Sequence, residues 1–83
     1  MTKPIGVEVD LESKSGYVAY SDRRIAETHE VWDEGTIAAD VDAGGEIVGI
    51  EMLQLDRDTL SRARRYAEEH DLIFPAMLDL AAP

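Results

Sequence analysis

The sequence predicts an α+β domain: an antiparallel, meander-like sheet of four to five short strands, then one main α-helix and an apolar C-terminal segment. Two patterns support this prediction. Apolar residues recur at every second position as far as Leu53, the period of strands, and at every third or fourth position after Asp56, the period of a helix. With 83 residues the chain has room for one domain. Its predicted parts are the sheet over 5–55, the helix over 56–71 and the tail over 72–83.

The strands are predicted from alternation of apolar and polar residues. In the first strand Ile5, Val7 and Val9 alternate with small or charged residues. In the second, Val18 and Tyr20 share a face, whereas the third is polar enough to be an exposed or edge strand. The predicted strands after the first cover residues 17–20, 25–31, 36–42 and 46–53.

The clearest hairpin signal lies between the last two strands. Residues 42–45 read Asp-Ala-Gly-Gly, and the two glycines can adopt positive φ between two alternating runs. The returning strand places Val48, Ile50 and Met52 on one face. Gly49 within this strand predicts either a bulge or a close approach by another part of the chain.

The helix begins at an acidic residue. Asp56 and Asp58 both stand where a cap or first-turn acid is favourable, and either could cap the helix. Two pairs of oppositely charged residues, four positions apart, are spaced for ion pairs on the helix surface: Arg64 with Glu68, and Arg65 with Glu69.

The predicted core is small. A chain of this length buries only about 60–65% of the surface that its unfolded form exposes, so self-association is an economical way to add stability. We therefore expect a homodimer, the commonest closed assembly. The residues predicted to be buried within the domain come from two strands and one helix stripe: Val7, Val9, Val48, Ile50, Leu60, Ala63 and Ala67.

The C-terminal segment is unusually apolar for a chain end. Pro75 prevents the helix from running through it. A free tail of this composition would expose an adhesive surface, so it either folds over the domain's own sheet or crosses to a partner. The residues predicted to mediate interaction are Leu72, Phe74, Met77, Leu78 and Leu80.

The charge balance restricts the class of partner. Eighteen acidic residues against eight basic ones give a net charge of −10, which repels nucleic-acid phosphates and anionic membranes. No apolar run approaches the ~20 residues of a membrane span, and no signal-peptide pattern follows Met1. We expect a cytoplasmic protein without nucleic-acid or membrane partners, whose acidic surface suits a basic protein.

No catalytic, cofactor or metal site is predicted. The absence of cysteine excludes disulfides and thiolate zinc sites. His29 and His70 lie far apart in the sequence, and nothing in the sequence brings a third group, such as a nucleophile or an oriented acid, beside His29 and Glu27.

A faint calcium-loop pattern lies in the hairpin. Asp40, Asp42 and Glu46 are spaced like loop carboxylates, but Gly44 stands where a third oxygen ligand is needed. A solvated hairpin is the better interpretation.

Three blocks resemble the small bacterial family of unknown function DUF2283, over residues 5–55. The first is a tyrosine-containing strand that ends in Ser-Asp, at residues 17–22. The second is a Val/Ile-Ala-x-Thr-x-Glu-Val run, at residues 25–31, and the most specific is Ile-Val-Gly-Ile-Glu-Met-Leu, at residues 47–53. The sequence departs from the family pattern at residues 14–16, where Asp-Ala-Leu is usual, and at the small pair Ala38-Ala39.

The resemblance implies a compact sheet-plus-helix fold and no established activity. Some members look like antitoxin halves of toxin–antitoxin gene pairs. Together with the charge, this favours a non-enzymatic protein-interaction module, an antitoxin-like partner of a small basic toxin. The alternatives are a small-ligand-binding domain, which needs an apolar pocket between sheet and helix, and a structural accessory subunit without catalytic activity.

Overall fold

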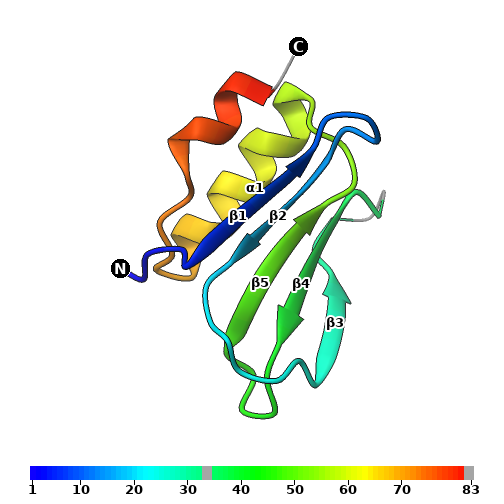
Figure 1. The fold of residues 1–83 in the computed structure, drawn as a ribbon. Coiled ribbons are helices and arrows are strands. Elements are labelled where there is room, and N and C mark those ends of the chain that lie inside the picture. Colours follow the sequence, from blue (N-terminus) through cyan, green and yellow to red (C-terminus); the bar gives the residue numbers. More distant parts are fainter. Residues whose placement is uncertain (33–34, 82–83) are drawn as a thin grey trace.

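The computed structural model describes residues 1–32 and 35–81, in which a five-stranded antiparallel sheet packs one face against a helix (Figure 1). The helix follows all five strands, so the predicted α+β class is confirmed. The elements are β1 (Gly6–Asp10), β2 (Ser15–Ala19), β3 (Glu27–Glu30), β4 (Ile37–Val41), β5 (Ile47–Met52), α1 (Arg57–Glu69) and the 3-10 helix η1 (Ala76–Ala81).

The strand order is β1-β2-β5-β4-β3, which departs from a simple meander at one connection. After β2 the chain crosses to the far edge of the sheet, and β3, β4 and β5 then run back until β5 pairs with β2. The crossing segment is held to the β4–β5 hairpin, because Tyr20 N donates to Val48 O at 2.7 Å and Arg23 Nε lies 3.1 Å from Asp42 Oδ2. Consequently β5, the last strand in the sequence, is the central one.

The core lies between α1 and the middle of the sheet. Five of the seven predicted core residues are buried: Val48, Ile50, Leu60, Ala63 and Ala67. Val7 is only half-buried, and Val9 is 38% exposed, so the prediction is wrong for Val9. The reason is topological: β1 is an edge strand, whereas α1 packs against β5 at the centre.

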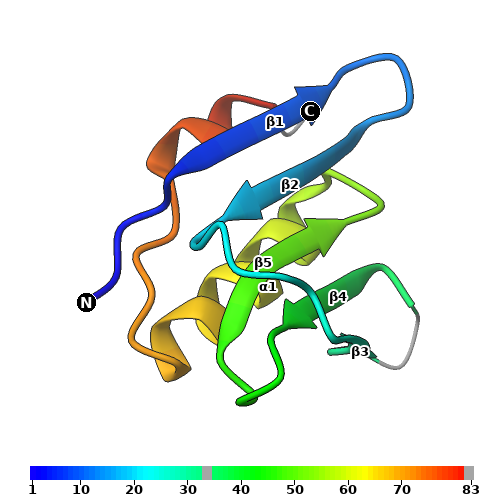
Figure 2. The same cartoon turned by 60° about the horizontal axis from the view of Figure 1, so that its bottom comes forward.

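The C-terminal segment folds back over its own domain, and η1 lies on the helix side of the sheet (Figures 1 and 2). Leu72, Phe74 and Leu78 are buried in the same core cluster as the sheet residues. Met77 and Leu80 remain 60% and 89% exposed. Three of the five predicted interaction residues are therefore core residues of this chain, and the other two lie on its surface.

Hydrogen bonds fasten the start of this segment to the N-terminal residues of the chain and to Tyr20, which follows β2. Thr2 N donates to Asp71 O and Ile73 N donates to Thr2 O, each at 2.8 Å. The hydroxyl of Tyr20 donates to Ile73 O at 2.9 Å. The tail is therefore integrated by polar as well as apolar contacts.

Asp56, rather than Asp58, caps α1: its Oδ1 accepts a hydrogen bond from Thr59 N at 2.7 Å. Asp58 instead pairs with Arg62 at 3.5 Å. The pairs predicted from Arg64 and Arg65 to Glu68 and Glu69 are absent from the described residues, and Arg64 pairs with Asp79 of η1 at 2.8 Å. Along a helix, an ion pair is more favourable when the acidic residue precedes the basic one. The observed Asp58–Arg62 pair has this order, whereas the predicted pairs have the arginine first.

Removal of the cap should give a pH-dependent loss of stability. The hydrogen bond from the backbone N–H of Thr59 lowers the pKa of Asp56 from its usual value in the folded state, so this carboxylate stabilises the fold above its unfolded pKa. That contribution is lost as the pH falls through the folded-state pKa. Asp56→Ala should cost about 1 kcal/mol at neutral pH and much less in strong acid, as measured by urea unfolding.

Asp56→Asn is the matched control, because asparagine also caps helices but does not titrate. Its stability should stay close to that of the parent chain at neutral pH. An alanine variant that is as stable as the parent at neutral pH would contradict the role of Asp56.

Candidate functional site

The face of the sheet opposite α1 is uncovered in the described part of the chain. Figures 1 and 2 show α1 and η1 on one side of the sheet and no helix on the other. We call this surface the open face. Its residues alternate with the core residues along each strand, and the strand registers identify them as Gly6, Glu8, Asp10, Ser15, Tyr17, Ala19, Thr28, Glu30, Ala38, Asp40, Gly49 and Glu51.

The open face is acidic and contains no lysine or arginine. The strands hold six acidic residues, two each in β1 and β3 and one each in β4 and β5, and all except Glu27 lie on the open face. All eight basic residues of the chain lie outside the strands, in turns, connections, the N-terminal segment and α1. None of the ion pairs among the described residues involves an open-face carboxylate. These charges are therefore available to a partner.

A tyrosine lies at the centre of this face. The phenol of Tyr17 covers Gly49, where any Cβ would overlap the ring. Its hydroxyl donates to Asp40 Oδ2 at 2.8 Å, and Thr28 Oγ1 donates to the other carboxylate oxygen at 2.6 Å. The network thus links β2, β4 and β3 across the top of β5.

The close approach predicted for Gly49 is confirmed, and the strand pairing is irregular beside it. The register between β4 and β5 shifts next to this residue, between Asp40 and Val41. The ring of Tyr17 also approaches the backbone of Gly49 closely. A glycine here lets an aromatic ring lie flat on the sheet.

The environment keeps the Tyr17 phenol protonated. Partial burial, the hydrogen bond to Asp40 and the negative charges of Asp40 and Glu51 all raise the pKa of Tyr17 well above its usual value. The hydroxyl therefore remains a donor, which holds the ring in place. With Ala19, Ala38 and Gly49 around it, the ring is part of a shallow surface with few large side chains.

Two histidines that the sequence separates widely line one hollow of about 330 Å³ on the helix side of β3. His29 Nε2 lies 3.0 Å from Glu27 Oε2, and the ring of His70 lies 4.3 Å from that of Tyr66. Within residues 1–32 and 35–81, no group of three or more histidine, cysteine or acidic side chains is placed to hold a metal ion. The hollow therefore brings together titratable groups without forming a metal-binding geometry.

The hairpin that resembled a calcium loop is a hydrogen-bonded turn. Asp42 Oδ1 accepts from the backbone N of Gly44 and of Glu46, both at 2.9 Å, and Gly45 takes a φ of 84°. Asp40 points to the open face, where Tyr17 and Thr28 bind it. The two aspartates therefore have separate structural roles.

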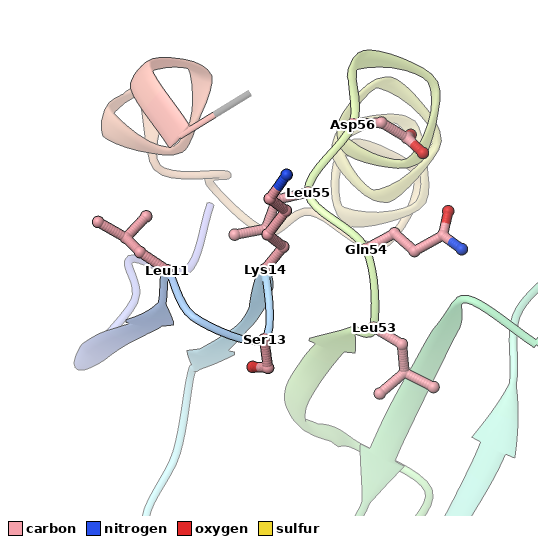
Figure 3. A pocket seen from close by; sticks show the side chains of 7 residues that line it. All are labelled: Leu11, Ser13, Lys14, Leu53, Gln54, Leu55 and Asp56. Carbon is pink, nitrogen blue, oxygen red and sulfur yellow. The ribbon is translucent and has the colours of Figure 1, made fainter. Parts of the chain in front are cut away.

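A groove of about 450 Å³ lies at one end of the sheet, between the β1–β2 turn and the β5–α1 connection (Figure 3). Its lining includes Leu11, Lys14, Leu53 and Asp56. Figure 3 shows that these side chains do not converge: Leu11 and Leu53 point away from each other. The groove also differs in place from the pocket between sheet and helix that a ligand-binding domain was expected to need.

Sequence reasoning missed the open face as a site. The signal was nevertheless present, because the alternating segments contain acids on the face opposite the apolar residues and no lysine or arginine within the five strands. The net charge of the whole chain does not reveal this signal, because it does not distinguish one face of the sheet from the other.

The fold is that of a small α+β domain with one covered and one open sheet face. The chain belongs to a family of proteins of unknown function, DUF2283, which it matches over residues 5–55. This match spans all five strands and ends before α1. Neither the curated proteins nor the solved structures contain a match to this chain. None of the helices in the described ranges is long and apolar enough to cross a membrane.

Proposed function

We propose that this protein is a non-enzymatic interaction module that docks a basic segment of a partner protein on the open face of its sheet. The observation that carries this proposal is the distribution of charge: five carboxylates share one uncovered face without a lysine or arginine. Such a field attracts cationic partners and speeds their encounter.

The shape of the face suits arginine in particular. The ring of Tyr17 lies over Gly49 and is fixed through its hydroxyl, with Glu51 on the neighbouring strand opposite it. A guanidinium group can stack on such a ring while it donates hydrogen bonds to a carboxylate beside it. The small residues around the ring leave room for that approach.

The partner in this proposal is a protein, because the same charges repel nucleic-acid phosphates. A small basic toxin has the required chemistry, which makes an antitoxin-like role one form of the proposal. A cytoplasmic location is also part of it, and a chain without cysteine suits that reducing compartment.

The test is a titration of the isotope-labelled full chain with a short peptide of alternating arginine and alanine, followed by NMR. Amide signals of Tyr17, Gly49 and Glu51 should shift most. A triple variant, Glu8→Gln, Glu30→Gln and Glu51→Gln, should weaken binding about 3- to 150-fold, because each exposed charge contributes roughly 0.2–1 kcal/mol. Asp40 is retained in this variant because it anchors Tyr17.

The matched control removes three charges from elsewhere: Glu12→Gln, Glu68→Gln and Glu69→Gln, all of which are exposed. It changes the net charge equally, so it should alter binding much less than the open-face triple. If the two triple variants weaken peptide binding equally, the effect comes from net charge alone, and docking on the open face is refuted.

A further inference from the structure

Strand β1 has one unpaired edge. It pairs with β2 on one side, and no described strand lies on its other side. Exposed apolar side chains accompany this edge: Ile5 is 64% exposed and Val9 is 38% exposed. An edge strand with uncovered apolar residues is a template for pairing with another chain.

The hydrogen-bonding pattern shows which backbone groups are free. Tyr20 N donates to Val48 O, so the backbone groups of Tyr20, and by alternation those of Val18, point toward β5. Those of Tyr17 and Ala19 then point toward β1, where their partners are Glu8 and Gly6. The N–H and C=O groups of Val7 and Val9 consequently point away from the sheet.

Among the two-fold antiparallel registers centred on Val7, Glu8 and Val9, which pair β1 with itself, only the one centred on Val7 avoids like charges. Centring on Glu8 places two glutamates opposite each other, and centring on Val9 places Glu8 opposite Asp10. Centring on Val7 places Glu8 opposite Gly6 of the second copy, and brings Val9 to the position of Ile5, which precedes β1 and whose N–H donates to Ala19 O of its own chain. Like charges directly opposite each other destabilise a sheet, whereas apolar pairs stabilise it.

We infer that two copies of this chain associate through β1 in the register centred on Val7, which joins their sheets into one of ten strands. In this register the outward backbone groups of Val7 bond to their own counterparts, and the exposed side chain of Val9 lies against the second copy. The occupant of this edge is thus a second copy of the chain. The inference concerns self-association and does not depend on docking of a basic partner.

The opposite edge of the sheet is less suited to self-pairing. Strand β3 has four residues, two of them glutamates, and all four are exposed. It carries no apolar side chain that pairing would cover, and charged residues are the usual protection of an edge strand.

Gly6 provides a test that is specific for the register. No atom lies within 4 Å of the position that a Cβ at Gly6 would occupy, so longer side chains fit there without a clash in the single chain. In the inferred dimer each Gly6 faces Glu8 of the other copy. Gly6→Lys should therefore tighten the dimer and Gly6→Glu should weaken it, by about 2- to 30-fold each for two contacts per dimer.

Sedimentation equilibrium of the full-length chain measures these dissociation constants at low salt. The two variants form a matched pair, because both replace glycine by a long side chain and differ in charge. Opposite shifts of the dissociation constant support the inference. A monomer at every concentration, or equal shifts in both variants, would overturn it. A dimer whose dissociation constant is unchanged by both Gly6 variants, but which is lost in the double variant Met77→Ser and Leu80→Ser, would also overturn it. That result would place the contact at the tail.

Discussion

Shortening the chain after Asp71 should abolish its cooperative unfolding transition. The cut removes Leu72, Phe74 and Leu78, which are between 1% and 8% exposed in the core. Fully burying a large apolar side chain contributes about 1.5–3 kcal/mol, so the three represent roughly 5–9 kcal/mol. A typical domain has a total stability of only about 5–15 kcal/mol. Thermal unfolding followed by circular dichroism measures the loss.

A surface variant of the same segment separates packing from simple shortening. Leu80 is 89% exposed, so Leu80→Ser should change stability by no more than about 0.5 kcal/mol. A shortened chain that unfolds at the parent's temperature would show that residues 1–71 hold the fold without the tail.

Replacement of Ile50 by alanine should destabilise the domain by about 2–5 kcal/mol. Ile50 is fully buried on the central strand, where it lies opposite Val18 on one side and Ala39 on the other. These neighbours belong to paired strands and cannot easily collapse into the space left by the larger side chain. Urea unfolding at equilibrium gives the difference in the free energy of unfolding.

Glu51→Gln is the control within the same strand, because Glu51 is exposed on the open face. Its effect should stay within about 0.5 kcal/mol. A cost below about 1 kcal/mol for Ile50→Ala would mean that Ile50 contributes little to the core.

Local features were predictable where a few neighbouring residues decide them. The alternation that placed Val48, Ile50 and Met52 on one face is confirmed, because all three are buried. The turn at Asp42 and the exposure of β3 are confirmed as well. In each case the relevant physics, side-chain period or turn hydrogen bonding, acts over only a few residues.

The order of the strands and the depth of burial of their side chains were harder to predict from the sequence. Alternation reports which face a residue occupies, but not which strands are neighbours, so the crossing from β2 to the far edge left no local signal. Val9 shows the consequence: its pattern is that of a core residue, yet its strand lies at an edge. The burial of the tail was equally hard to predict, because a run of apolar residues does not specify whether it packs in the core of its own chain or against a partner.

The candidate site was the least predictable part. Tyr17, Thr28 and Asp40 come from three strands, and their hydrogen bonds form only because β5 lies between β2 and β4 and carries a glycine under the ring. The joint lining of one hollow by His29 and His70 likewise depends on where the C-terminal end of α1 lies relative to β3. Contacts of this kind depend on distances through space that no spacing in the sequence encodes.

The sequence by itself determined the α+β class, the single helix with its acidic cap, the hairpin at residues 42–45 and the surplus of negative charge. Local backbone preferences and side-chain periodicity are sufficient for these. Only the tertiary structure decided that β5 is central, that Leu72, Phe74 and Leu78 complete the domain's own core, and that five carboxylates gather on one uncovered face around Tyr17. These outcomes depend on which strands pair and which surface the helix covers, and long-range packing sets both.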